Sequence, residues 1–178
     1  MASLQASLRG QYAQAPDDLA RVLLAVNRTF FDSTAGARYA TLFLGTYDER
    51  TSRLRYANCG HPPPVLRTAG GSIERLAPTG TVIGLFEEWR GTTHEIGLSS
   101  RDTLVMFTDG VVEAFNAQGE EFGEERVLDL VREQTDLSAG KLVDALVHAV
   151  ERHSGPTQFD DFTVVVARGR ELDAGSSP

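Results

Sequence analysis

Two strand-like segments joined by a short polar turn constrain the fold of this chain more than any other feature. Residues 38–48 (RYATLFLGTYD) and 53–59 (RLRYANC) are rich in aliphatic and aromatic residues, and the polar segment DERTS separates them. Residues 64–68 and 72–76 flank the pair Gly70-Gly71 in the same way. Strands joined by such tight turns pair in antiparallel fashion, so the sequence predicts a sheet built from hairpins.

Helical patterns lie on both sides of these strands. Residues 2–14 form one expected helix, and Asp17-Asp18 opens a second helix that ends near residue 34. Two more helices are expected over 123–135 and 138–153, the latter with Ser138 as its N-cap. Further strands are expected near 89–97, over 104–108 and over 160–169. This order predicts an α+β fold in which helices lie outside packed antiparallel sheets.

Composition excludes several classes of function. The chain has 178 residues, a net charge of −8 and no run of basic residues, which argues against a nucleic-acid partner or an anionic membrane surface. It contains no apolar stretch of about 18 residues, so we expect no membrane span, and its first residues lack the apolar core of a secretory signal. The single cysteine, Cys59, cannot form an internal disulfide. We therefore expect a cytoplasmic protein.

Acidic residues stand at the ends of the two most apolar strand segments. Asp109-Gly110 follows LVMFT, and Asp160-Asp161 precedes FTVVVA. If these two strands pair antiparallel, Asp109 and Asp160 lie close together. Carboxylates at the edge of a core lose hydration, and several placed together are best stabilised by a hard divalent cation such as Mg²⁺ or Mn²⁺.

A simpler interpretation of the same acids stays open at this point. Asp-Gly is common in turns, and an aspartate before a strand is a common cap. Either pair alone is explained more economically in this way. The residues by themselves therefore leave both a metal site and ordinary turn chemistry available.

Four stretches of the sequence, in the order in which the family has them, resemble one known family. TDGVVEAFNAQGEEFGEERV and QFDDFTVVVARG are similar to the C-terminal half of the metal-dependent Ser/Thr protein phosphatases of the PPM or type 2C superfamily. YATLFLGTYDERTSRLRYANCGHPPPVLR and PTGTVIGL resemble its bacterial branch named for stage II sporulation protein E. The resemblance spans about residues 3–168. It implies a phosphatase domain over 1–170, with a flexible tail at 171–178, and a four-layer α/β/β/α sandwich.

The resemblance also implies roles for individual residues. Asp109 matches an aspartate that binds one ion of a dinuclear Mn²⁺ or Mg²⁺ centre, and Asp160 matches a second ligand, with Asp161 beside it. Apart from the resemblance, the position of Glu113 soon after the Thr-Asp-Gly turn fits a role in ordering that turn or a nearby water, with Gly110 beside it, and the preference for acids at a helix start explains Glu113 equally well. In the family, metal-held water attacks the phosphoserine or phosphothreonine of a partner protein, and in this branch the partner can be an anti-sigma-factor antagonist.

The chain departs from the family pattern at one point. The family places an Asp-Val-Ser-Gly-His-Gly-like segment before its first long helix, whereas here that helix begins at residue 2. We therefore expect the first strands and a bridging carboxylate to be missing, one weakly held ion at best, and low activity of the chain alone. Unpaired sheet edges would favour dimerisation. The rival interpretation is a non-catalytic, pseudophosphatase-like interaction module, and an unrelated α+β protein whose acids are only caps is a third.

Overall fold

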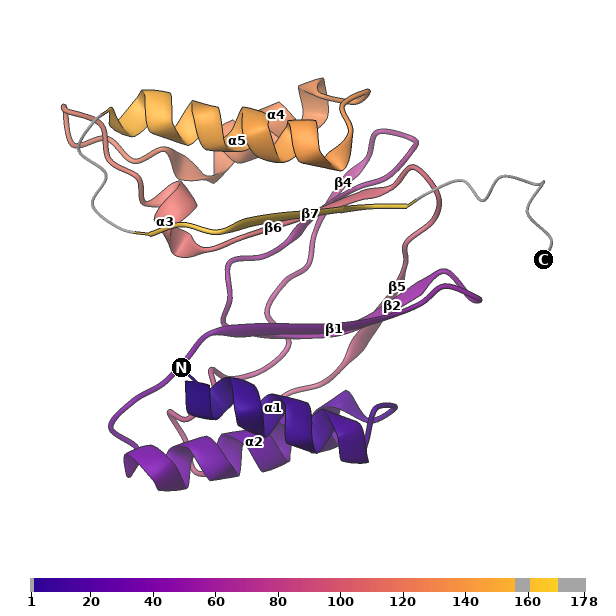
Figure 1. The fold of residues 1–178 in the computed structure, drawn as a ribbon, viewed down its shortest axis with the longest axis vertical. Helices are drawn as coiled ribbons and strands as arrows, with labels where there is room; N and C mark the ends of the chain where they lie inside the picture. The colour runs from indigo at the N-terminus through magenta and orange to yellow at the C-terminus, as the bar shows by residue number, and fades with distance from the viewer. Residues whose placement is uncertain (1, 156–160, 170–178) are drawn as a thin grey trace. The chain divides into compact units, whose positions relative to one another are not determined.

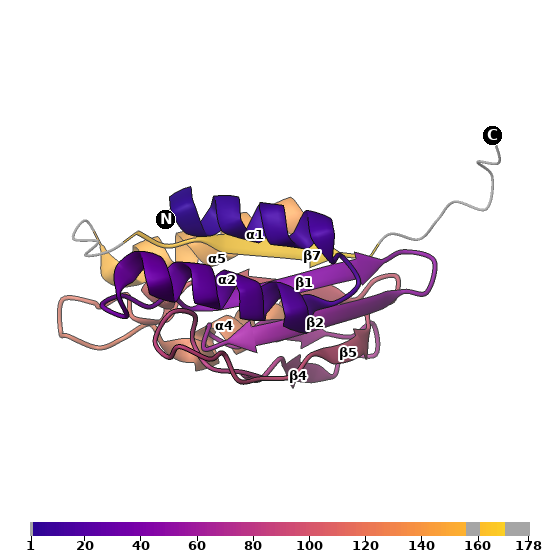
Figure 2. The same ribbon diagram turned by 90° about the horizontal axis from the view of Figure 1, so that it is seen from below.

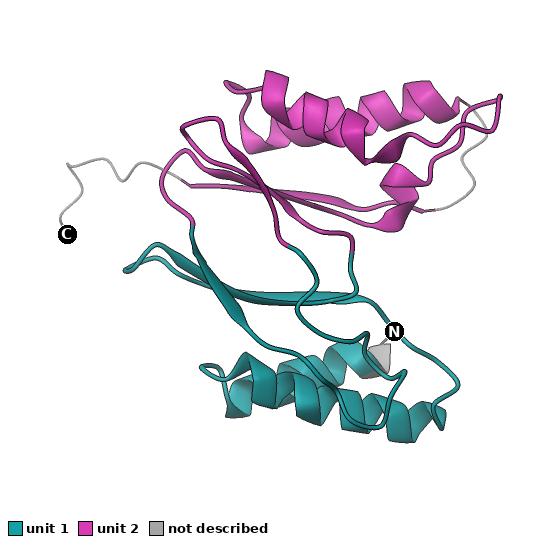
Figure 3. Cartoon of the chain, turned by 180° about the vertical axis from the view of Figure 1, so that it is seen from behind, with its two compact units in different colours: residues 1–61, 77–97 teal, residues 62–76, 98–178 magenta. Residues whose placement is uncertain are grey.

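The computed structural model describes residues 2–155 and 161–169, which divide into two compact units (Figures 1 and 3). Unit 1 comprises residues 1–61 and 77–97, and unit 2 comprises 62–76 and 98–178. The expected tail, 171–178, lies outside the described residues. None of the described helices has the length and apolarity that a membrane span requires.

Unit 1 is a helical pair on a three-stranded antiparallel sheet. Its sheet has the order β1-β2-β5, with strands Leu42–Asp48, Arg53–Cys59 and His94–Gly97. Helices α1 (Ala2–Gln14) and α2 (Leu19–Thr34) lie side by side along one face of this sheet, as Figures 1 and 2 show. The apolar side chains of α2 pack against alternate residues of the sheet because both elements turn one apolar face inward. The buried core consists of Leu4, Val22, Leu23, Val26, Ala57, Cys59, Ile83 and Trp89.

Unit 2 repeats the two-layer plan with a four-stranded antiparallel sheet. The order is β4-β3-β6-β7, with strands Ile73–Arg75, Val65–Arg67, Thr103–Phe107 and Val164–Arg168. Helices α4 (Gly123–Glu133) and α5 (Ala139–Ser154) cover one face, and the one-turn helix α3 (Asp109–Val112) follows β6 directly (Figure 1). The buried core consists of Val65, Val105, Phe107, Val111, Phe122, Val127, Leu128, Val131, Leu142, Leu146 and Val150.

The α+β class and the hairpins predicted from the sequence are confirmed. Ser138 caps α5, because its hydroxyl accepts a hydrogen bond from the Lys141 backbone N–H. Asp18 caps α2 from outside the helix, where the sequence predicted a first-turn position. Helix α3 was not predicted.

Several predicted strands are shorter than expected, and the last of them, β7, begins only at Val164. The first begins at Leu42, because Ala40 forms only an isolated bridge with Ile83. The strand predicted near 89–97 begins at His94. The preceding residues form a loop, Gly80–Gly91, in which the Trp89 indole packs against the glycines at both ends and donates a hydrogen bond to the Thr81 carbonyl.

A buried asparagine on α2 holds this loop in place. Asn27 is 1% exposed, and its Nδ2 donates to the carbonyls of Phe86 and Glu87 at 3.0 and 3.1 Å. Its Oδ1 accepts from the Gly84 N–H at 2.8 Å. Gly84 has φ +84°, and any Cβ there would overlap the Phe30 ring. The amide therefore satisfies three backbone groups that lie 57 to 60 residues away in the sequence.

We predict that Asn27→Ala lowers the free energy of unfolding by about 2–4 kcal/mol, because two carbonyls and one N–H lose their partner inside the protein. Urea unfolding followed by circular dichroism measures this loss. Gln5→Ala, which removes an exposed amide from α1, serves as the control and should change stability little. Equal stability of the two variants would contradict the proposed clamp.

Cys59 is a buried core residue of β2. Burial raises the pKa of its thiol from the ordinary value of 9.0 to about 11. The thiol should therefore be neutral and unreactive at neutral pH in the folded protein.

We predict that Ellman's reagent labels Cys59 in urea but not in native buffer at neutral pH. Between pH 9 and about pH 11 the unfolded chain loses the thiol proton while the folded chain retains it, so stability falls as pH rises through this range. Urea titrations across this range measure the slope, and Cys59→Ala should remove this contribution. Fast labelling of the native protein would contradict the burial argument.

Candidate functional site

Antiparallel pairing of β6 with β7 brings the two acidic segments together. The register runs from Thr103↔Arg168 to Phe107↔Val164. Beyond the ladder, the Thr108 N–H donates to the Thr163 carbonyl at 3.1 Å, and the Thr163 N–H donates to the Thr108 hydroxyl at 2.9 Å. The pairing on which the sequence argument depended is therefore present, and two further hydrogen bonds extend it toward the acids.

Asp109 is the first residue of α3 and is exposed to solvent. Thr108, in an extended conformation, precedes the helix, and the Asp109 carbonyl accepts from the Glu113 N–H at 2.9 Å. One carboxylate oxygen, Oδ1, accepts from the Gly110 N–H at 3.0 Å. A helix N-terminus favours a carboxylate at this position, so part of the placement of Asp109 is explained by local structure.

Gly110 lies close against the second acidic segment. A Cβ at this position would lie 2.6 Å from the Asp161 carbonyl oxygen and 3.3 Å from the Phe162 Cβ. Only a residue without a side chain permits the start of the β7 segment to pass so near α3. Asp109 and Asp161 therefore belong to chain segments in direct backbone contact, and both residues are exposed.

Two predicted site residues remain, Glu113 and Asp160. Glu113 is exposed and forms the C-terminal cap of α3, four residues from Asp109. Asp160 lies outside the described residues. Within the described residues, no three His, Cys, Asp or Glu side chains gather closely enough to hold a metal ion.

The donor chemistry nevertheless suits a hard divalent cation. Asp109 and Asp161 offer carboxylate oxygens, which Mg²⁺ and Mn²⁺ prefer, and the narrow approach at Gly110 keeps their segments adjacent.

Sequence reasoning overlooked Thr108, whose backbone and hydroxyl both bind Thr163. A threonine before Asp-Gly was visible, but its partner is 55 residues away. It also overlooked Asn27, for which the available signal was a polar residue amid the apolar face of α2.

Curated relatives of this chain match it at low identity. It is 29% identical over 130 residues to Protein IcfG of Synechocystis sp., covering 72% of this chain and 20% of that protein. It is 26% identical over 150 residues to phosphoserine phosphatase RsbU of Bacillus subtilis, covering 83% of this chain and 44% of that protein. The chain thus spans less than half the length of these curated relatives.

Solved structures share the fold over almost the whole chain. The SiaA-PP2C domain of Pseudomonas aeruginosa superposes with a TM-score of 0.80 at 21% identity, over 93% of this chain and 67% of that one. RsbX in complex with magnesium superposes with a TM-score of 0.66 at 13% identity, over 92% of this chain and 71% of that one. At these identities the likeness establishes the fold alone.

A family model agrees with the motifs and with the fold. The model, described as Stage II sporulation protein E (SpoIIE), matches residues 1–170. This range includes all of unit 1, all of unit 2 up to residue 170, and both acidic segments. The chain therefore belongs to the stage II sporulation protein E (SpoIIE) family.

Proposed function

We propose that this chain is a metal-dependent protein phosphatase domain that acts on phosphoserine or phosphothreonine of a regulatory partner protein. The observation that carries the proposal is the backbone contact between Gly110 and Asp161, which keeps Asp109 and Asp161 on adjacent segments. Membership of the SpoIIE family and the similarity to phosphoserine phosphatase RsbU also support a phosphatase activity.

Asp109 and Asp160 are the proposed metal ligands, with Asp161 beside them. Bound Mn²⁺ or Mg²⁺ supplies an activated water at neutral pH and offsets the charge of the phosphoryl oxygens. The contribution of the chain is positional: Thr108 fixes the start of α3 against Thr163, and Gly110 lets the Asp161 backbone approach. Gly110 and Glu113, at the two ends of the α3 turn, shape the surroundings of Asp109.

The proposed substrate is a phosphorylated protein, and an anti-sigma-factor antagonist is the class that the family resemblance suggests. The net charge of −8 makes nucleic acid a poor partner. A cytoplasmic location accords with such a partner. We further propose that the open edge strands β1 and β7 support dimerisation, because Val165 on β7 is 46% exposed on a strand without a protecting proline or lysine.

A second candidate is a non-catalytic module that binds the same kind of partner. The observation in its favour is the exposure of the adjacent apolar residues Leu85 and Phe86 in unit 1, which offer a surface for a partner. Both a phosphatase domain and a binding module would bind the partner protein, but only the phosphatase domain would release phosphate from it.

We predict that the chain releases phosphate from a phosphoserine protein in the presence of Mn²⁺, and that Asp109→Asn reduces turnover by roughly 100-fold or more because a charged ligand is lost. Malachite green detection of phosphate measures the rate. Asp144→Asn, an exposed aspartate of α5 in the same unit, is the matched control. Unchanged turnover in Asp109→Asn would refute the assignment, whereas tight partner binding without turnover by the parent chain would favour the binding module.

We predict that Gly110→Ala weakens Mn²⁺ binding and lowers the free energy of unfolding by about 1–3 kcal/mol, since the added methyl must displace the Asp161 backbone. Isothermal titration with Mn²⁺ and urea unfolding measure the two effects. Gly140→Ala is the control, because a Cβ there on α5 meets nothing within 4 Å. If the two alanine variants behave alike, the Gly110 contact does not support the site.

A further inference from the structure

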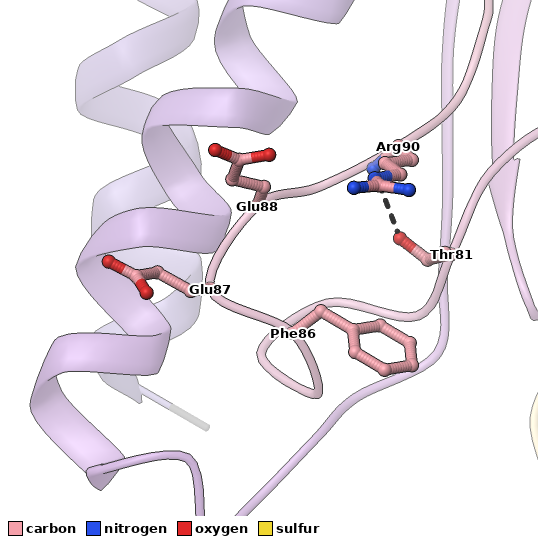
Figure 4. A pocket seen from close by; sticks show the side chains of 5 residues that line it. All are labelled: Thr81, Phe86, Glu87, Glu88 and Arg90. Carbon is pink, nitrogen blue, oxygen red and sulfur yellow. Dashed lines mark hydrogen bonds between the residues drawn. The ribbon is translucent and has the colours of Figure 1, made fainter.

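The loop after Ile83 forms a pocket in unit 1 that is unrelated to the acidic segments of unit 2. Its volume is about 510 Å³, and Thr81, Phe86, Glu87, Glu88 and Arg90 line it. Figure 4 shows Glu87 and Glu88 on the side of the neighbouring helix, with Arg90 beside Thr81 on the other side and the Phe86 ring below. We call this cavity the Phe86 pocket.

Large apolar side chains are exposed around the Phe86 pocket. Phe86 is 53% exposed and its neighbour Leu85 is 44% exposed. Single exposed hydrophobic residues are ordinary on protein surfaces, but Leu85 and Phe86 are adjacent and form a small apolar patch at the pocket, which favours contact with another molecule.

The patch is held rigidly, which distinguishes it from a mobile loop. The Asn27 amide binds the backbone of Gly84, Phe86 and Glu87. On the other side, the Thr81 N–H donates to the Arg90 carbonyl at 2.8 Å, and the Thr81 hydroxyl accepts from the Arg90 N–H at 3.2 Å. Phe86 is therefore presented in one backbone conformation, so its burial by a partner would cost little ordering entropy.

The charges around the Phe86 pocket favour a basic group on its α2 side. Arg28 is already shared between Asp32 and Glu87, at 3.1 and 2.7 Å. Within the described residues, Glu88 makes no ion pair with a basic side chain. Counting Asp32, Glu87 and Glu88 against Arg28 and Arg90 gives a local charge of −1, and the whole chain carries −8. A cation beside Phe86 would also face the aromatic ring.

We propose that the Phe86 pocket is a docking site for a segment of a partner protein that carries an apolar side chain next to a lysine or arginine. The apolar side chain packs on Phe86, and the basic side chain lies against Glu88 on the α2 side. This proposal goes beyond the proposed phosphatase activity and does not depend on it, because no residue of the pocket belongs to the acidic segments.

The test uses the full chain and short synthetic peptides that differ only in one residue pair: Leu-Lys, Leu-Glu or Ala-Lys at the centre of the same polar sequence. Trp89 is the single tryptophan, and its indole bonds to Thr81 of the pocket, so its fluorescence reports occupancy. We expect the Leu-Lys peptide to bind most tightly. Phe86→Ala should weaken that binding by about tenfold, and Glu88→Gln should reduce the preference for lysine over glutamate by about threefold.

Tyr47→Ala, which removes a 49% exposed aromatic residue of β1 in unit 1, is the matched control and should bind like the parent chain. Urea unfolding checks that each variant is folded. The proposal is overturned if no peptide saturates the fluorescence change, if the Leu-Glu peptide binds as tightly as Leu-Lys, or if Phe86→Ala binds unchanged. Sedimentation velocity showing self-association that Phe86→Ala abolishes would also overturn it, because the occupant would then be a second copy of the chain.

Discussion

The pairing of β6 with β7 is the interaction on which the candidate site depends. It connects chain segments more than 50 residues apart, and the Thr108–Thr163 hydrogen bonds carry the register past the last ladder pair. Without that register, Gly110 and Asp161 would not meet. The apolar content of the two strands thus has a chemical consequence, because burial of Val105 and Phe107 against the helices fixes where the neighbouring carboxylates lie.

In unit 1, side chains rather than strand pairing hold the loop Gly80–Gly91 in place. This loop has no regular secondary structure beyond isolated bridges, and its buried backbone groups need other partners. Asn27 supplies them from α2, and Trp89 fills the space between two glycines. The result is an ordered loop whose outer residues, Leu85 and Phe86, remain exposed. The same polar side chain therefore stabilises the unit and presents the patch to which we assign a partner.

Much of this architecture could be predicted from local sequence, because local rules decide it. Gly70-Gly71 specifies a hairpin and Ser138 caps a helix regardless of the rest of the chain. The antiparallel interpretation also predicted that the end of the strand before Asp109 would lie beside the start of the strand after Asp161, as the β6–β7 pairing shows. Helix α3 and the late start of β5 depended on tertiary contacts, namely the backbone of Thr163 and the Trp89 packing, and no pattern within a short window reports those. The position of Asp160 remains a prediction.

Neither unit is a continuous stretch of chain, since the backbone changes unit after residues 61, 76 and 97. During synthesis on the ribosome, β2 can pair with β1 at once, but its second partner, β5, is made only after the β3–β4 hairpin of the other unit. Strand β7 is the last described element to be made, and β6 cannot acquire its acidic neighbour before then. A nascent chain would thus complete the sheet of unit 1 before that of unit 2, and would gain the arrangement around Gly110 only once β7 has been made.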